Sequence, residues 1–469
     1  MKNSSIKKIF PVFIMALAIL VNPQLANSQS VKYALPSYVK YKLGNGLTVY
    51  LMEQHSVPII VVSAVFDAGA VKDGENQGLA SLTAEALMFG TEKYTKQELE
   101  SNLDFLGASV TTGAALESAS LTASFLKKDQ DKVFEMAGQV LMKPVFNEQE
   151  FAKRFARKKV ELERAKESPG QVIGDYYSHY LYGNHPYGTA VGGTPKSIEN
   201  IKVQDLKDFY QKNYTPDRAC IAVAGDFDIT NMKTQVAKYF GSWKTAKSTG
   251  GSIPPPAINP QSQGILLIDK DNAIETRFLI GGKGLSRSNP DYIAVQVINT
   301  ILGGRFTSWL NDALRVNAGL TYGANSSFIY NKLGGSFAIS SYTRNATTIQ
   351  AIDMALDVLN RLHTKGIDEE TLLSAKNYIK GGFPPRYETI ASKARLLTEM
   401  FIYGFDEKFI NDFEKNVDAV TVEKAKDVIN KYFPSKNLQF VLIGKASEIR
   451  DQVRKYGTLS EKNIKDQGF

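Results

Sequence analysis

An internal repeat is the feature that most constrains how this chain can fold. Residues 214–216 (Tyr-Thr-Pro) lead into an apolar run that ends at Gly225, and residues 432–434 (Tyr-Phe-Pro) lead into another that ends at Gly444. Proline and glycine are nine residues apart in the first copy and ten in the second, and the two prolines are 218 residues apart. Duplication of one structural unit is the economical interpretation, although two unrelated helix-turn-strand units would give the same pattern.

Each half mixes strand patterns with helix patterns. In the first half, β-rich runs at 47–52 and 59–66 have the separation of a hairpin. The other predicted strands are 219–224, 265–268, 276–281, one that starts at 320–322, and 438–443. The predicted helices are 76–90, 96–105, 129–142, 147–166, 203–213, 290–301, 305–317, 346–363, 368–380 and 421–431. The sequence therefore predicts an α+β fold of two homologous halves, each with strands on one face and helices on the other.

The N-terminus has the three parts of a secretory signal. Lys2, Lys7 and Lys8 precede an uncharged apolar run at 9–21, and small residues at 26–28 suit a cleavage site. The apolar run is too short to span a bilayer, which argues against an uncleaved anchor. We expect a periplasmic or otherwise exported protein without stable membrane insertion after cleavage.

The predicted organisation is a signal peptide at 1–28, a first domain at 29–245, a linker rich in Pro, Gly and Ser at 246–263, and a second domain at 264–469. Removing the signal lowers the formal charge from +8 to +5, and no cluster of basic and aromatic residues follows, so we expect no nucleic-acid partner. The single cysteine, Cys220, excludes an intramolecular disulfide and a cysteine zinc cluster.

One predicted helix carries the pattern that points to a family. Ser81, Ala84 and Glu85 lie at positions i, i+3 and i+4, so they share a helix face. The surrounding run, 78–91, resembles the helix of the pitrilysin/insulinase (M16) zinc metallopeptidases, which carries a His-x-x-Glu-His motif. Here both histidines and the glutamate general base are replaced. The resemblance therefore implies a degenerate motif and no metal or other cofactor in this chain.

The family's third zinc ligand is a glutamate about 76 residues further along, and Glu161 follows Glu85 by 76 residues. Two carboxylates without a nitrogen or sulfur ligand do not make a zinc site. Two outcomes stay open. Glu85 and Glu161 hold a hard cation between them, or they are left over from the motif, solvated or paired with a lysine or arginine.

Further matches extend the resemblance over most of the mature chain. Residues 184–188 (Asn-His-Pro-Tyr-Gly), 192–198 and 209–217 are similar to successive family motifs. His185 has no partner ligand at helical spacing, so we interpret it as a turn residue that packs on Tyr187.

The second half carries the family's other motif. Arg315 and Tyr322 are seven residues apart in a pattern in which, by resemblance, an arginine and a tyrosine face the zinc and contact the substrate. A phenol can donate to a developing oxyanion and a guanidinium can hold a carbonyl. In the alternative interpretation, Arg315 neutralises a helix end and Tyr322 packs in the sheet.

In short bacterial members, one subunit often carries the zinc motif and another the Arg/Tyr pair. This chain is similar to the second kind, which implies clam-like subunits, a homologous zinc-bearing partner and a peptide or unfolded polypeptide as substrate. Residues 106–114 are our candidate for the chamber wall, with the peptide added as a strand near Thr112, Gly113 and Ala114. Two alternatives remain: an inert structural protein of the same fold, and a stand-alone hydrolase that uses Ser81.

Overall fold

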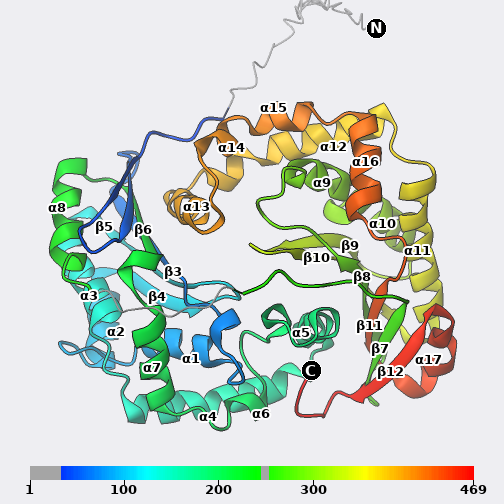
Figure 1. Cartoon of the computed structure of the whole chain (residues 1–469), viewed down its shortest axis with the longest axis horizontal. Coiled ribbons are helices and arrows are strands. Elements are labelled where there is room, and N and C mark those ends of the chain that lie inside the picture. The colour runs from blue at the N-terminus through cyan, green and yellow to red at the C-terminus, as the bar shows by residue number, and fades with distance from the viewer. Residues whose placement is uncertain (1–32, 245–252) are drawn as a thin grey trace, which may run out of the picture.

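The computed structural model describes residues 33–244 and 253–469. Figure 1 shows two halves side by side, each built on one sheet. The predicted signal peptide and linker residues 246–252 lie outside the described residues, so those predictions stay predictions. Among the described helices, none has the length and apolar character needed to cross a membrane.

The first half forms a six-stranded sheet in the order β1-β2-β6-β3-β5-β4. Its strands are β1 (Val39–Lys42), β2 (Thr48–Glu53), β3 (Ile59–Phe66), β4 (Ser109–Ala114), β5 (Ala119–Leu126) and β6 (Ala219–Gly225). The predicted hairpin between β2 and β3 is wrong, because β6 lies between them, parallel to β2 and antiparallel to β3. Every residue of β6 is buried, and a strand of that kind belongs in the centre of a sheet.

The second half repeats this sheet in the order β12-β7-β11-β8-β10-β9. Its strands are β7 (Gly264–Asp269), β8 (Glu275–Lys283), β9 (Ala324–Tyr330), β10 (Gly335–Arg344), β11 (Gln439–Gly444) and β12 (Thr458–Asn463). The two orders correspond strand by strand, which confirms the duplicated α+β fold. They differ at one edge, where β1 is antiparallel to β2 but β12 is parallel to β7.

Each half contributes helices, most of which cover the outer face of its own sheet. In the first half these are α1 (Leu79–Ala86), α2 (Lys96–Leu106), α3 (Gln130–Met142), α4 (Glu148–Ala165), α5 (Pro169–Tyr182), α6 (Pro195–Ile198), α7 (Val203–Asn213) and α8 (Ile229–Phe240). The second half has α9 (Tyr292–Asn299), α10 (Trp309–Asn311), α11 (Thr348–Thr364), α12 (Glu369–Gly382), α13 (Ile390–Tyr403), α14 (Glu407–Asn411), α15 (Phe413–Asp418), α16 (Val422–Tyr432) and α17 (Ala446–Val453). Short turns of 3-10 or π-helix connect several of them.

Two of these helices are exchanged between the halves. α5 follows the first half's helices but packs on β8 and β11, and α13 comes from the second half but packs on β3 and β6 (Figure 1). The Tyr177 hydroxyl of α5 donates to the Phe337 carbonyl at 2.6 Å. Neither helix was predicted from the sequence. Gly170, Gly174 and several β-formers weaken the helix pattern of α5, whereas α13 carries regular helical spacing that could have revealed it.

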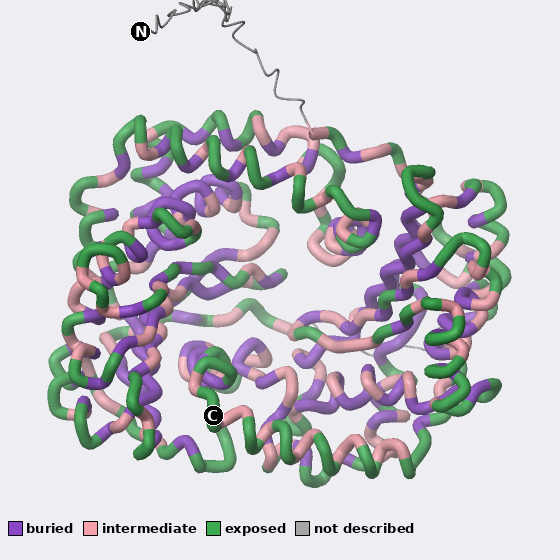
Figure 2. Tube along the Cα trace, turned by 180° about the vertical axis from the view of Figure 1, so that it is seen from behind, coloured by how far each residue is buried: buried purple, intermediate pink, exposed green. Residues whose placement is uncertain are grey.

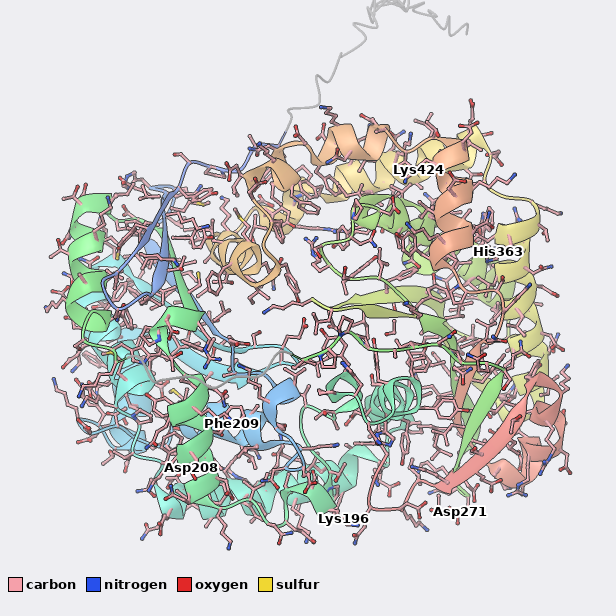
Figure 3. The ribbon with its side chains drawn as sticks, in the orientation of Figure 1. Lys196, Asp208, Phe209, Asp271, His363 and Lys424 are labelled. Atoms are coloured by element: carbon pink, nitrogen blue, oxygen red, sulfur yellow. The ribbon has the colours of Figure 1, made fainter. Side chains whose placement is uncertain are left out.

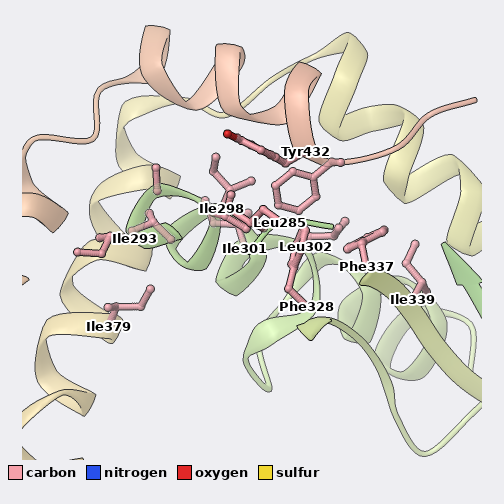
Figure 4. Close-up of a cluster of buried hydrophobic side chains, with 14 of the residues drawn as sticks. Leu285, Ile293, Ile298, Ile301, Leu302, Phe328, Phe337, Ile339, Ile379 and Tyr432 are labelled. Atoms are coloured by element: carbon pink, nitrogen blue, oxygen red, sulfur yellow. The ribbon is translucent and has the colours of Figure 1, made fainter. Parts of the chain in front are cut away.

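The exchange buries both faces of each sheet. Along β6, Ile221 and Val223 pack under the outer helices, and the alternating Cys220, Ala222 and Ala224 pack with α13. Buried backbone accordingly runs through the interior of both halves in Figure 2. Figure 4 shows the apolar cluster behind β9 and β10, including Leu302, Phe328, Phe337 and Tyr432. This cluster gives β9 a rigid backing.

Candidate functional site

A buried aspartate fixes the start of α1. The Asp73 carboxylate accepts hydrogen bonds from the backbone N–H groups of Gly78 and Ala80, each at 2.8 Å. Gly78 has φ +98°, and a Cβ there would come within 3.0 Å of the Gly192 carbonyl oxygen, so glycine is required. These contacts set the direction in which the face carrying Ser81 and Glu85 points.

The degenerate zinc positions face two cations of α4. Arg154 Nε donates to Glu85, and Arg154 Nη1 donates to Glu161 Oε2 at 3.0 Å. Lys158 Nζ lies 3.4 Å from both Ser81 Oγ and Glu85 Oε1. The structure therefore brings Ser81, Glu85 and Glu161 together, with basic side chains between them. We call this group of five residues the α1–α4 charge cluster.

The α1–α4 charge cluster does not fit a metal ion. Its two carboxylates already accept hydrogen bonds from cations, and it contains neither histidine nor cysteine. Across residues 33–244 and 253–469, no group of three or more His, Cys, Asp or Glu side chains is arranged to hold a metal. Of the two outcomes left open for Glu85 and Glu161, the structure shows pairing with a basic side chain.

Sequence reasoning missed Arg154 and Lys158. The signal was present, because positions 154, 158 and 161 follow one another at i, i+4 and i+7 and so share a helix face. Arginine and lysine do not serve as zinc ligands, so a metal-binding pattern does not include them.

Ala84, which stands at the position of the motif's glutamate, connects α1 to the edge of the sheet. Its side chain is fully buried, and its carbonyl accepts a 2.7 Å hydrogen bond from Thr112 Oγ1. Thr112 belongs to β4, which pairs only with β5 and is the edge strand of its sheet. A Cβ at Gly113 would meet nothing within 4 Å, so the strand surface is open there. The 106–114 segment thus provides the expected strand, with the Thr112 hydroxyl engaged by α1 rather than free.

Arg315 and Tyr322 lie at the surface of the second half. The Arg315 guanidinium stacks over the Phe306 ring at 4.4 Å, and Phe306 is itself mostly exposed. Tyr322 is 82% exposed. The alternative interpretation that Tyr322 packs in the sheet is therefore wrong. Both side chains are free to meet a second molecule.

The backbone around this pair departs from the predicted helix at 305–317 and strand start at 320–322. One turn of α10 continues into a π-helical segment, Asp312–Asn317, and β9 begins only at Ala324. The Thr321 hydroxyl accepts from the Gly323 N–H at 3.1 Å, which closes a tight turn before the strand. π-helical insertions are rare in proteins, and those that occur are often found at functional sites. Tyr322 therefore stands on a turn, ahead of the strand.

The two half-sites are separated within one chain. α1 lies in the first half and α10 in the second, on opposite sides of the molecule in Figure 1. Between the described residues, no hydrogen bond or ion pair joins Arg315 or Tyr322 to the α1–α4 charge cluster.

Four cavities of about 380–490 Å³ lie elsewhere. Three are marked in Figure 3 by the outer residues Asp271, Lys424 and the pair Asp208 and Phe209. The fourth lies between the first sheet and α13 and is lined mainly by hydroxyl groups and aliphatic side chains, together with Arg395 and Glu399. None of the four includes a residue of the candidate sites.

His185 behaves as the sequence predicts. Its ring lies 4.9 Å from the Tyr187 ring, edge to face, and Nδ1 accepts from the Tyr187 N–H at 3.0 Å. Its Nε2 lies 2.8 Å from the Pro254 carbonyl oxygen. It is a turn residue that also holds the end of the linker.

Comparison with known proteins agrees with this geometry. The sequence profile described as insulinase (peptidase family M16) matches residues 48–195, and the one described as peptidase M16 inactive domain matches 200–379. An uncharacterized zinc protease of Bacillus subtilis is 22% identical over 84% of this chain and 95% of its own length. A Helicobacter pylori protein named a non-peptidase homolog is 23% identical over 83% of this chain and 90% of its own length.

Among solved structures, a peptidase M16 inactive domain from Pseudomonas fluorescens superposes with a TM-score of 0.82 at 26% identity, covering 87% of this chain and 98% of that one. The two matched profiles together span well over half of the sequence. The degenerate motif, the duplicated sheets and these matches lead to one conclusion: the chain belongs to the M16 family of insulinase-like peptidases.

Proposed function

We propose that this chain is the exported, non-metal-binding subunit of a heterodimeric M16 endopeptidase. It supplies Arg315 and Tyr322 to peptide hydrolysis in the zinc site of a homologous partner. The observation that carries the proposal is the contrast between two sites. The α1–α4 charge cluster ties up the residues at the chain's own degenerate zinc positions, whereas Tyr322 is exposed and Arg315 stacks on the exposed Phe306 without an ion pair to any described residue.

The roles of the two residues follow from their chemistry. A phenol hydroxyl donates to the negative charge that develops on a peptide carbonyl oxygen when it is attacked. A guanidinium binds a carbonyl of the substrate before and during the reaction. Tyr322 therefore acts mainly on turnover, and Arg315 also on substrate binding.

The substrate is a peptide or unfolded polypeptide that adds as a strand. β4 is an edge strand, so its outer backbone groups are not paired within its sheet. Edge strands bind extended peptides through main-chain hydrogen bonds, with side chains alternating between the two faces. The open surface at Gly113 leaves room for a side chain of the bound peptide.

Mixing the chain with a zinc-bearing homologue tests the proposal. If an adjacent gene encodes a homologue with an intact His-x-x-Glu-His motif, that protein is the first one to try. We expect neither subunit alone to cleave a quenched fluorescent peptide, and the mixture to cleave it. An active zinc-bearing subunit that gains nothing from this chain would contradict the proposal.

An inert M16 protein that serves only for interaction is the second candidate. The profile name and the structural match both carry the words inactive domain, and one relative is named a non-peptidase homolog. This function predicts a stable complex whose activity does not depend on Arg315 or Tyr322. The two candidates therefore differ in the effect of substitutions at these residues.

The stand-alone hydrolase gains no support. Lys158 approaches Ser81 at 3.4 Å, but the same ammonium group also donates to Glu85. A charged ammonium group has no lone pair with which to accept the Ser81 proton. The Ser81 hydroxyl also donates to Glu85 Oε1 at 3.4 Å, but Arg154 and Lys158 already engage that carboxylate, which makes it a poor acceptor for the Ser81 proton.

A further inference from the structure

The tips of two corresponding hairpins meet between the halves. The β4–β5 turn carries Glu117, whose side chain is buried, and the β9–β10 turn spans residues 331–334. The backbone N–H of Lys332 donates to both oxygens of Glu117, at 3.0 Å each. One turn thus holds the other through a carboxylate that reaches across the boundary between the halves.

Tyr187 completes this contact. Its hydroxyl donates to Glu117 Oε1 at 2.5 Å and accepts from the Leu333 N–H at 3.0 Å. Burial, together with the hydrogen bond to Glu117, raises the pKa of Tyr187, so the hydroxyl keeps its proton and remains a donor. Tyr187 comes from the segment 184–188 that the proposed function does not use. We call Glu117, Tyr187 and the 331–334 turn the junction.

Both functional strands end at the junction. β4, the candidate peptide-binding edge, ends at Ala114, three residues before Glu117. β9 ends at Tyr330, two residues before Lys332, and its other end follows Tyr322. A rigid hairpin backed by the apolar cluster of Figure 4 therefore connects the junction to the turn that carries Tyr322.

We propose that Glu117 and Tyr187 are positioning residues, which hold the edge strand β4 and the β9–β10 hairpin in one fixed relation. The inference rests on the proposed function for the role of the two strands. The Glu117 carboxylate is buried, so it needs several hydrogen-bond donors to stabilise its negative charge. If one donor is removed, the remaining donors must stabilise that charge alone, because water does not reach it.

Hydrogen exchange and spin-label distances in the mature full-length chain test this proposal without a partner. Exchange would be followed at the amides of Lys332 and Leu333, with the buried centre of β6 as the reference for global unfolding. Nitroxide labels on T111C and N325C, two exposed strand positions, would report the distance between β4 and β9. The native Cys220 is fully buried and will not take the label.

Tyr187→Phe and Glu117→Gln should each speed exchange at these two amides by roughly tenfold and broaden the distance distribution, while the β6 amides stay protected. Tyr210→Phe is the matched control, because the Tyr210 hydroxyl donates to the Leu141 carbonyl at 2.6 Å within the first half. It should change neither readout. The milder Glu117→Gln keeps the test valid if Tyr187→Phe does not fold.

Two outcomes would overturn the proposal. In the first, exchange at Lys332 and Leu333 accelerates but the distance distribution stays as narrow as in the wild type, so other contacts position the strands. In the second, neither readout changes. Because both measurements use the chain alone, their failure is distinguishable from failure of the mixing experiment, which tests the proposed function.

Discussion

Arg154 on α4 forms an ion pair with Glu85 on α1, at the helix position where the family motif has its second histidine. Lys158 approaches the other carboxylate oxygen at 3.4 Å. The three side chains are largely buried, so solvent screens them less than it screens a surface pair. Two cations of the chain itself therefore satisfy the carboxylate and join the helices that a zinc ion joins in the family's peptidases.

The first prediction concerns metal content. The purified mature chain should hold far less than one zinc per molecule after dialysis, because no imidazole is offered at positions 81, 84 and 85. Elemental analysis measures this directly. About one tightly bound zinc per chain that disappears in Glu161→Gln would contradict this prediction, because it would show that the α1–α4 charge cluster binds a metal ion.

Restoring the motif should not by itself restore the site. In the triple variant Ser81→His, Ala84→Glu and Glu85→His, Arg154 and Lys158 still point at the new ligands. Replacing these two cations with alanine should strengthen zinc binding of the triple variant by roughly 10- to 100-fold. Calorimetric titration compares the two variants. Equal affinities would mean that the cations move away freely.

Arg154→Ala should lower the free energy of unfolding by about 1–3 kcal/mol, because it leaves Glu85 with only the longer 3.4 Å contacts to Lys158 and Ser81. Arg157→Ala is the matched control, since Arg157 lies on the exposed face of the same helix. Its effect should stay within about 0.5 kcal/mol. Urea titrations of both variants provide the comparison, and equal losses would refute a specific role for Arg154.

Tyr322→Phe should lower kcat of the assembled peptidase by roughly 10²–10³-fold, or about 3–4 kcal/mol, with KM little changed. Stability should not change, because the ring is 82% exposed. Arg315→Ala should also raise KM. Wild-type kcat for Tyr322→Phe, in a complex that size-exclusion chromatography shows intact, would favour the inert interaction protein.

His55 should make stability depend on pH. Its ring nitrogens lie 2.6 Å from Asp226 and 2.8 Å from Glu53, and hydrogen bonds to Asp226 and Glu53 raise its pKa. A raised pKa means that the stabilisation is complete below the unfolded pKa of about 6.5 and is lost as pH rises through the folded value.

Urea unfolding of the wild type and His55→Gln should therefore differ more at about pH 5.5 than at about pH 8.5, and salt should shrink the difference. His363 provides a control of opposite sign, because burial lowers its pKa. A difference between wild type and His55→Gln that is independent of pH would exclude this ion-paired role.

Local patterns were sufficient to predict much of the fold. Local patterns predicted six of the twelve described strands and most outer helices but missed β1, β5, β10 and β12, and the repeat predicted the correspondence of the two sheets. The edge-strand candidate at 106–114 was also found, because a short polar strand after a helix is visible in the sequence. The start of β9 was placed two to four residues too early, since the turn at Thr321 and Gly323 depends on local hydrogen bonds.

The sequence by itself determined the family, the duplication and the loss of the zinc motif, because each of these depends on which residue stands at a given spacing. The tertiary structure decided that Arg154 and Lys158 pair with Glu85 at the degenerate motif, that α5 and α13 exchange sheets, and that Glu117 holds the opposite hairpin. These contacts join residues 69 to 215 positions apart, or pair a helix of one half with the sheet of the other. The spacing of residues along the chain does not reveal these contacts. They form only when the two halves come together and bury both faces of each sheet.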